Sequence, residues 1–251
     1  MLAGVFSAKG SPGVTSSALV LAAVWPRPVI LLEADLTGSD LIYRCRSEAG
    51  GAVAASPSVL GLASAMRGNR PAALTDWSQR LACGVEVVTG VTTPSQARGL
   101  GAEFWRSLAV QTMTADADVI VDFGRLDRDS ATIALATACD VLVPVAASSV
   151  ESLMHLRELL RDLVFDGPRL VPLLIGPART AAADALDLDE VLAMAGVLAA
   201  PALNLPLDHP GLTSLEAGAT ASGRGRGHLL VRAGKAAAAR LGESTGIEVG
   251  P

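Results

Sequence analysis

The sequence predicts an α/β fold in three layers, a mostly parallel sheet flanked by helices. Short apolar runs alternate along the chain with Ala- and Leu-rich stretches of helical length, and this alternation is typical of βαβ units. Half of the 251 residues are hydrophobic but only 3% are aromatic. Ala, Leu and Val must therefore build the core around strands that are buried on both faces. We expect a single domain over 1–251, with a short flexible tail after about 242.

Six apolar runs are expected to form strands of this sheet. Most are short, rich in Val, Ile and Leu, and bounded by Gly, Pro or an acid, which is the pattern of buried strands. The first precedes Lys9, and the others are 28–35, 85–89, 118–124, 140–145 and 170–176. The second run ends in Glu33 and Asp35, and the fourth contains Asp122 near its end. Since the carboxyl ends of parallel strands share one edge of a sheet, these acids are expected to meet in one crevice.

The segment after the first strand has the character of a phosphate-binding loop. In such loops, backbone N–H groups and the positive end of a helix dipole converge on an anion. The general pattern is G-x-x-x-x-G-K-S/T, and 8–15 fits it with Gly13 and Thr15 in place. Val14 stands where the pattern has its lysine. A different lysine, Lys9, lies near the start of the loop, and the chain holds only one other, Lys235.

At this loop the chain resembles the ParA/MinD family of deviant-Walker ATPases, whose loop reads K-G-G-x-G-K-S/T-S/T. By that resemblance Lys9 matches the signature lysine, which reaches across a nucleotide-sandwich dimer to the partner's phosphates. Val14 replaces the ordinary phosphate-loop lysine, and Ser11 replaces the second glycine. The resemblance implies that seven loop residues bind the nucleotide: Lys9, Gly10, Ser11, Gly13, Val14, Thr15 and Ser16.

The resemblance extends from about 2 to 241. Glu33 and Asp35 correspond to the family's D-x-D at the start of switch I, and Asp122 corresponds to its Walker B acid. The resemblance implies ATP and Mg²⁺ as cofactors and catalytic roles for Lys9 and Asp35, the latter positioning the attacking water. Thr15, Asp35 and Asp122 would hold Mg²⁺, with Thr15 as a direct ligand and Asp122 acting through water.

Three departures from the family pattern weaken the expected activity. Losing the lysine at Val14 removes a charge-assisted phosphate contact, which lowers affinity roughly ten- to hundredfold. Pro12 has no N–H to donate to the phosphates. The Asn that binds adenine in the family is absent at Gly176 and Pro177. We expect weak nucleotide binding, and, if the chain is an enzyme, a slow Mg-dependent ATPase.

Three functions stay open at this point. The first is a ParA/MinD-like positioning ATPase in partition or subcellular localisation. The second is a nucleotide-independent pseudo-ATPase scaffold similar to the TadZ/CpaE pilus-localisation factors, which tolerate degenerate phosphate loops. The third is a small-molecule enzyme such as a dethiobiotin-synthetase-like ligase, against which Val14 counts because those enzymes need the lysine. The resemblance also implies a homodimer and a protein partner that contacts 35–40 and 122–129.

The basic residues near the C-terminus suggest a further partner. The net charge is −5, but 222–241 holds five basic residues and no acid. These are Arg224, Arg226, Arg232, Lys235 and Arg240. ParA-like proteins bind DNA non-specifically through basic residues in their C-terminal half, and such binding depends strongly on salt. The alternative is a solvated helix face.

Composition also bears on the compartment. No apolar stretch is long enough to span a bilayer, and the start lacks the features of a signal peptide. The three cysteines show no C-x-x-C spacing, which is typical of reduced thiols in a cytoplasmic protein. We therefore expect a cytoplasmic protein with no integral membrane segment.

Overall fold

The computed structural model describes residues 1–10, 12–68, 73–113 and 115–243. Ser11, which was expected to contact nucleotide, lies outside the described residues, as does the part of the chain from 244 to 251 that was expected to be a flexible tail.

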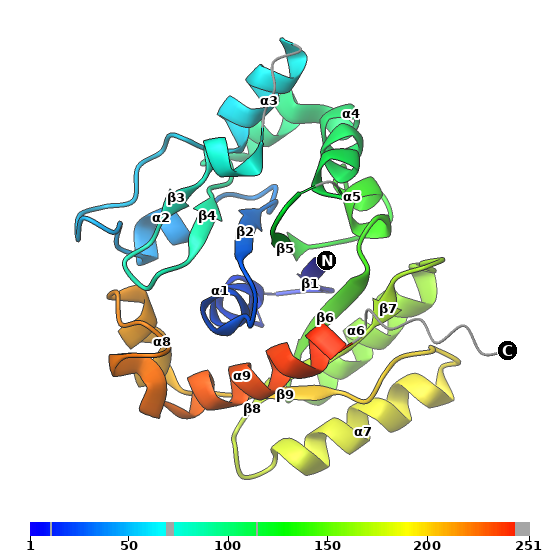
Figure 1. Ribbon diagram of the computed structural model, residues 1–251. Helices are drawn as coiled ribbons and strands as arrows, with labels where there is room; N and C mark the ends of the chain where they lie inside the picture. The colour runs from blue at the N-terminus through cyan, green and yellow to red at the C-terminus, as the bar shows by residue number, and fades with distance from the viewer. Residues whose placement is uncertain (11, 69–72, 114, 244–251) are drawn as a thin grey trace, which may run out of the picture.

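Within these residues a single sheet runs through the middle of the molecule (Figure 1). Its order is β3-β4-β2-β5-β1-β6-β8-β9, and β7 also pairs with β6. The strands are β1 (Leu2–Ser7), β2 (Val29–Glu33), β3 (Gln79–Arg80), β4 (Glu86–Val88), β5 (Asp118–Arg125), β6 (Val141–Ala147), β7 (Arg169–Leu170), β8 (Leu173–Gly176) and β9 (Leu203–Pro206). Only β3 and β4 are antiparallel to each other; all other paired strands are parallel. The predicted fold class is confirmed.

The run expected as one strand over 170–176 is divided into β7 and β8. Leu170 lies opposite Leu142, and Leu173 lies opposite Val145, so the register along β6 is kept across the gap. Pro172 falls in the gap. Because proline has no N–H, it cannot donate to the ladder, and the pairing is interrupted there.

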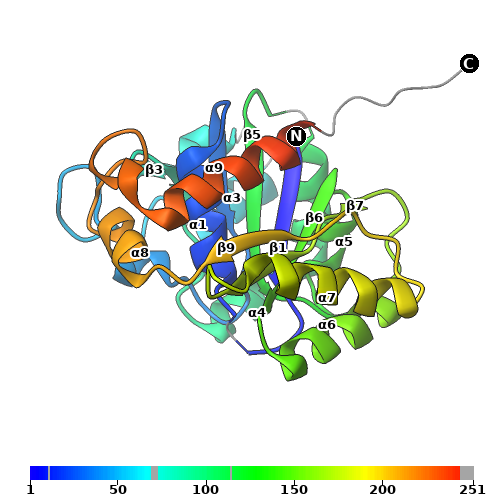
Figure 2. The same cartoon turned by 90° about the horizontal axis from the view of Figure 1, so that it is seen from below.

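The helices cover both faces of the sheet, as the sequence predicts (Figures 1 and 2). One face carries α1 (Val14–Val24), α2 (Leu41–Arg44), α8 (His209–Glu216) and α9 (Leu229–Gly242). The other carries α3 (Val59–Arg67), α4 (Pro94–Thr112), α5 (Ile133–Thr137), α6 (Val150–Asp162) and α7 (Ala181–Met194). Short 3-10 helices span Leu74–Trp77 and Arg224–Gly227. Each face has its own apolar core, built mainly from Leu, Val and Ala.

The position of α1 fixes the loop that precedes it. This helix is enclosed by the sheet on one side and by α9 on the other. The close contact with α9 is made at Gly234, where an added Cβ would lie 2.6 Å from the Val20 side chain. Helices pack this closely only where one of them lacks a side chain at the contact. The first turn of α1 is thereby held at the carboxyl end of β1.

The described helices also bear on the expectation about membranes. Among the described helices, none combines the length and the apolar character needed to cross a bilayer.

Candidate functional site

A cleft of about 530 Å³ opens at the carboxyl ends of β1, β2 and β5. Six of the predicted site residues line it, namely Gly10, Gly13, Val14, Thr15, Ser16 and Asp35. Asp122 lies beneath them, 1% exposed. Lys9 is exposed on the same loop but is not part of the lining. The structure thus brings together the metal-binding candidates and most of the loop, and leaves Lys9 outside the cleft.

The loop presents free backbone donors to this cleft. Gly13 is the N-cap of α1 with a φ of 102°, and Gly10 has a φ of 75°. Glycine adopts such left-handed conformations without strain. The first hydrogen bond of the helix runs from Ser17 N–H to the Gly13 carbonyl, 2.8 Å. The N–H groups of residues 14–16 therefore have no partner within the helix, and the dipole adds positive potential at the same place.

Val14 adds no charge to this arrangement. It is 6% exposed and belongs to the apolar cluster around α1, together with Ala18. Packed in that way, Val14 contributes only its backbone N–H and an apolar side-chain edge to the cleft. The cation that a lysine would bring is absent at this position.

Thr15 and Asp122 form the centre of the candidate metal site. The pKa of Asp122 is raised to about 7, mainly by burial and also by the neighbouring carboxylates of Glu33 and Asp35. The Thr15 side chain and the Gly124 N–H, 2.9 Å from Asp122 Oδ1, oppose this rise. Hydroxyl and carboxylate oxygens are the ligands that Mg²⁺ prefers. A bound cation would favour the charged form of Asp122.

Asp35 lies directly above the end of β5. Its Oδ1 accepts hydrogen bonds from the Thr37 N–H at 2.8 Å and the Thr37 hydroxyl at 2.7 Å. Gly124 has a φ of 61°, and a Cβ built on it would overlap the Asp35 carboxylate. A glycine at this position is therefore what allows the two segments to approach.

Glu33 has a role that the sequence reasoning missed. It is 2% exposed, and burial raises its pKa above the ordinary value. The Ser39 hydroxyl and the Gly90 N–H donate to its Oε2, the latter at 3.0 Å, and the Leu41 N–H donates to Oε1 at 3.3 Å. Glu33 is not among the residues lining the cleft. This acid anchors the segment that carries Asp35, rather than facing a ligand.

Two arginines in the cleft were also missed. Arg44, at the end of α2, and Arg125, at the end of β5, both line it. Arg44 Nε donates to Glu216 Oε1 at 2.8 Å, and its Nη2 donates to Ser16 Oγ at 2.8 Å. Arg44 and Glu216 are 172 residues apart, so no local pattern relates them.

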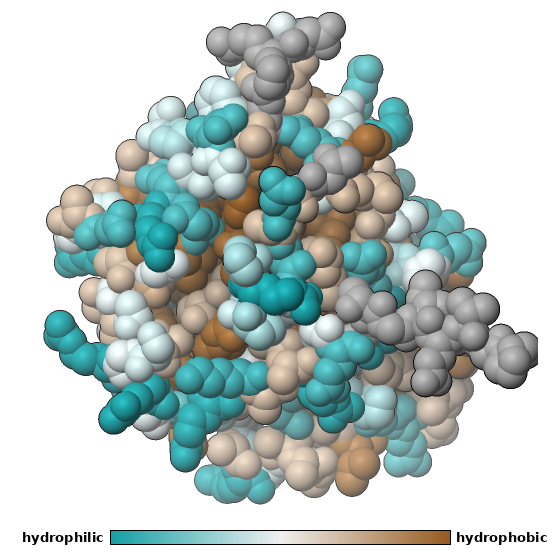
Figure 3. Space-filling model, viewed as in Figure 1, coloured by the Kyte–Doolittle hydropathy of each residue, from teal (hydrophilic) through white to brown (hydrophobic). Residues whose placement is uncertain are grey.

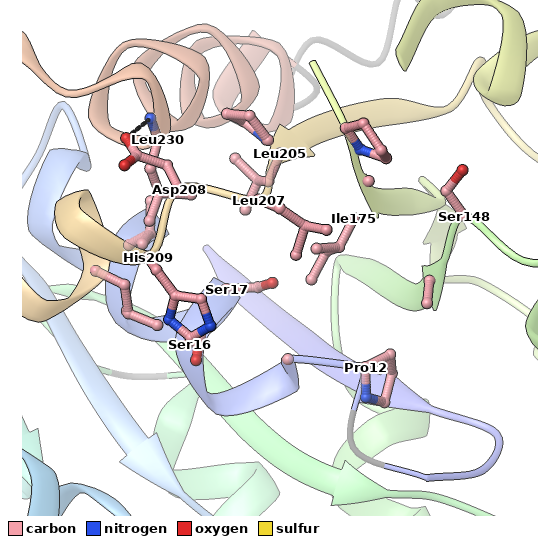
Figure 4. A pocket seen from close by; sticks show the side chains of 17 residues that line it. Pro12, Ser16, Ser17, Ser148, Ile175, Leu205, Leu207, Asp208, His209 and Leu230 are labelled. Carbon is pink, nitrogen blue, oxygen red and sulfur yellow. Dashed lines mark hydrogen bonds between the residues drawn. The ribbon is translucent and has the colours of Figure 1, made fainter. Parts of the chain in front are cut away.

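A second cavity of about 520 Å³ adjoins the first (Figure 4). Its walls are largely apolar, from β8, β9, α8 and α9, and Gly13 and Ser16 line both cavities. Asp208 accepts hydrogen bonds from the N–H groups of Gly211 at 2.9 Å and Leu230 at 3.1 Å. Ser17, 1% exposed, lines the cavity, and its Oγ has no hydrogen-bond partner among the described residues. A buried hydroxyl without a partner is costly unless a ligand satisfies it.

The comparisons with known proteins agree with this geometry. No protein-family model and no curated relative matches the chain. Solved structures do match. A ParA family ATPase from Chlorobium tepidum TLS has a TM-score of 0.76 at 18% identity, over 96% of this chain and 98% of that one. The septum site-determining protein MinD with Mg-ADP from Pyrococcus horikoshii OT3 has a TM-score of 0.72 at 14% identity, over 100% and 99%.

The chain has the ParA/MinD fold. A third structure of this fold, pNOB8 ParA bound to nonspecific DNA, has a TM-score of 0.63 at 14% identity and covers 97% of this chain and 99% of that one. At these identities the likeness concerns the arrangement of the backbone, and site residues must be argued from the chain itself.

The five basic residues of the C-terminal stretch are all exposed. Arg224 and Arg226 lie on the 3-10 helix before α9, and Arg232, Lys235 and Arg240 lie on α9. Figure 3 shows hydrophilic side chains over α9, separated by small apolar ones. The surface expected to contact DNA is therefore accessible on α9 and on the 3-10 helix that precedes it.

Proposed function

We propose that the chain is a ParA/MinD-like nucleotide-binding positioning protein, acting in partition or in the localisation of a cargo, with weak or absent ATP hydrolysis. The observation that carries the proposal is the meeting of the phosphate loop, the Thr15–Asp122 pair and Asp35 at one cleft. Such a crevice at the carboxyl ends of parallel strands is where ligands bind in this type of fold.

The residues present fit a Mg²⁺–nucleotide. Free N–H groups at residues 14–16 and the glycine turns suit the phosphates. Thr15, Asp35 and Asp122 offer the oxygen ligands that suit Mg²⁺. The adjoining apolar cavity, with the unpartnered Ser17 hydroxyl, suits the base and ribose. When bound, Mg²⁺ neutralises phosphate charge. The role of Asp35 is to orient a water molecule, and Thr37 holds its carboxylate in place.

The same residues argue for weak binding and slow turnover. Val14 packs in the core and brings no charge. Pro12 lines the second cavity without an N–H to donate. Gly176 and Pro177, also in the lining, have no side-chain amide for the base. Each missing contact reduces affinity, and the missing cation also reduces stabilisation of the charge that develops during phosphoryl transfer.

Dimerisation is part of the proposal. Lys9 is exposed beside the cleft instead of within it, so it is free to contact the phosphates of a second copy. In such a homodimer the segments 35–40 and 122–129 would present the surface that a partner protein contacts.

A second candidate is a nucleotide-independent scaffold similar to TadZ/CpaE factors. The burial of Val14 in the core favours it, because an apolar residue there stabilises the fold at the expense of phosphate binding. In this case the fold is kept for its partner surfaces, and nucleotide has no effect on assembly.

Non-specific DNA is a further proposed partner, through the exposed basic residues of 224–240. The neighbour pNOB8 ParA is a structure bound to nonspecific DNA. Contacts of this kind are made to phosphates and weaken as salt rises.

The deciding experiment is calorimetry with Mg²⁺ and either ATP or ADP. The chain would be compared with Lys9→Ala, with Val14→Lys and with Lys235→Ala, which removes the other lysine and serves as the control. Binding by the unaltered chain that Val14→Lys strengthens and Lys235→Ala leaves unchanged supports the nucleotide proposal. Loss of ATP binding in Lys9→Ala supports the role of Lys9. If the folded chain binds neither nucleotide at millimolar concentration, the nucleotide proposal is wrong and the nucleotide-independent scaffold is the remaining candidate.

A further inference from the structure

An arginine from outside the phosphate loop lies in the cleft beside that loop. Arg44 reaches from α2 to the first turn of α1, where its Nη2 donates to Ser16 Oγ at 2.8 Å. The loop pattern does not include this residue, because it lies on a different segment of the chain. Its side chain is 31% exposed and forms part of the cleft wall.

The guanidinium of Arg44 is only partly committed to the protein. A guanidinium has five N–H donors. Nε and Nη2 donate to Glu216, and Nη2 also donates to Ser16. The remaining nitrogen, Nη1, is 3.8 Å from Asp40 Oδ2, which is an ion pair but too long for a hydrogen bond. Among the described residues the two N–H groups on Nη1 have no hydrogen-bond acceptor, so they can donate to a ligand in the cleft.

The acidic lining of the cleft would disfavour a polyphosphate unless positive charge lies nearby. The cleft already holds the carboxylates of Asp35 and Asp40 in its lining, with Asp122 beneath them. A polyphosphate brings further negative charge, which these acids repel unless cations compensate. Among the described residues that line the cleft, only Arg44 and Arg125 are cationic. Of the two, Arg44 is held by a hydrogen bond to Ser16 in the first turn of α1, where the free N–H groups lie.

We infer that Arg44 is a phosphate-binding residue that supplies the charge absent at Val14. The inference rests on the proposed nucleotide function and deepens it. Arg44 and the N–H groups of the first turn of α1 would contact the same phosphates, and the planar fork of arginine suits that contact. Because Arg44 belongs to α2, an occupied site would also hold α2 against α1. The alternative is that Arg44 only ties α2 to α8 through Glu216.

The test measures binding of ADP with Mg²⁺ and, separately, of adenosine, which has no phosphate. Calorimetry would compare the unaltered chain with Arg44→Met, Arg44→Lys, Glu216→Gln and the double variant Val14→Lys with Arg44→Met. Thermal melting by circular dichroism verifies that each variant is folded. Glu216→Gln is the matched control, since it removes the charge that strengthens the tie to α8 but keeps the arginine.

We expect Arg44→Met to weaken ADP binding at least about tenfold, because a charged hydrogen bond is lost, and to leave adenosine binding unchanged. Val14→Lys is expected to restore ADP affinity in the Arg44→Met background. Glu216→Gln is expected to leave ADP affinity unchanged or to increase it. The ADP affinity of Arg44→Lys should lie between that of the unaltered chain and that of Arg44→Met.

Three results would overturn the inference. Equal ADP affinity with and without Arg44 shows that the guanidinium does not contact phosphate. Loss of ADP binding in Glu216→Gln as large as in Arg44→Met assigns Arg44 to the tie between α2 and α8. If the unaltered chain binds adenosine and ADP equally, phosphate recognition by any residue is absent. A chain that binds neither ligand refutes the proposed function itself, and this outcome is distinct from the other three.

Discussion

The Thr15 side chain interacts with the Asp122 carboxyl, which joins the first turn of α1 to the buried part of β5. Asp122 is 1% exposed, whereas Thr15 is partly exposed and lines the cleft. A cation in the cleft would take its oxygen ligands from this pair, so the pair couples the phosphate loop to the sheet.

The first prediction concerns that pair. Asp122→Asn keeps the size of the side chain and an oxygen that accepts from Thr15, but it removes the charge. We expect the variant to remain folded and to bind ADP equally with and without Mg²⁺, whereas the unaltered chain binds more tightly with Mg²⁺. Calorimetry in magnesium and in chelator measures the difference. A magnesium effect of unchanged size in Asp122→Asn would contradict the assignment of Asp122 to the metal site.

The second prediction separates backbone strain from displacement of Asp35. Gly124→Ala places a Cβ against the Asp35 carboxylate at a φ of 61°, whereas Gly84→Ala faces open space at a φ of 92°. Both variants lose about 1 kcal/mol through the left-handed backbone, but only the first moves Asp35. We expect only Gly124→Ala to lose more stability than this in urea unfolding and to lose magnesium-dependent ADP binding. Equal stability and equal magnesium-dependent ADP binding in the two variants would mean that Asp35 can move without affecting either property.

The sequence was sufficient for the strands and for the acids at their ends. A buried parallel strand is a continuous apolar run, and its boundary is marked where a carboxylate follows, as at Asp35. Gly13 and Thr15 were found for a similar reason, because the loop and its helix are neighbours in the chain. Local signals of this kind need no knowledge of the tertiary structure.

The contacts made by Arg44 and Glu33 had no such signal. Arg44 meets Glu216 across 172 residues, and Glu33 is anchored by Gly90 across 57. The packing of α2 beside α8 brings Arg44 to Glu216, and the pairing of β2 with β4 brings Glu33 to Gly90. The two-residue strand β3 was missed because it is too short to show a period, and β7 was predicted only as part of the run 170–176.

The third prediction uses one substitution with opposite outcomes at two helical sites. Replacing Gly by Ala within a helix ordinarily stabilises it by roughly 1 kcal/mol. Gly99→Ala on α4, two residues before the non-helical Gly101, meets nothing within 4 Å and should show a gain of up to this size. Gly234→Ala on α9 places its Cβ 2.6 Å from the Val20 side chain. That side chain is stiff because it is β-branched, so we expect a net loss of about 1–2 kcal/mol from overpacking. Urea unfolding of the two variants measures both; a gain at Gly234 would show that α1 and α9 can separate freely.

The fourth prediction concerns pH. Burial tends to raise the pKa of Asp118, but hydrogen bonds from the Met1 amino group at 2.7 Å, Trp25 Nε1 at 2.8 Å and Arg27 Nε at 2.7 Å outweigh it, and the pKa is lowered. A lowered pKa means that the folded state favours the carboxylate. Its contribution to stability is therefore present above the ordinary pKa of Asp, about 3.9, and is lost as pH falls through the lower folded value.

We expect Asp118→Asn to cost about 1–3 kcal/mol near neutral pH, since charge-assisted bonds are lost. The difference between the variant and the unaltered chain should shrink below about pH 4. Urea unfolding across this range, on protein made without an N-terminal tag, measures it. A difference that is constant with pH would show that the charge of Asp118 is not what stabilises the contact.

The fifth prediction tests the basic surface of α9. Replacing Arg232, Lys235 and Arg240 together by Gln removes three exposed charges from one helix. The matched control replaces Arg67, Arg98 and Arg106, which are exposed on α3 and α4 over the opposite face of the sheet. Both variants change the net charge equally, so a general loss of attraction to DNA affects them alike.

If the α9 surface contacts phosphates, its variant alone should weaken binding to random-sequence duplex DNA. Each phosphate contact adds about 0.9 to the slope of log affinity against log salt on duplex DNA, so the slope should fall by up to about 2.7 when three contacts are lost. Fluorescence anisotropy over a salt series, with nucleotide present and absent, measures both quantities. Equal weakening in the two variants would mean that net charge alone governs the interaction. If the unaltered chain does not bind DNA at low salt, the basic residues of α9 form only a solvated helix face.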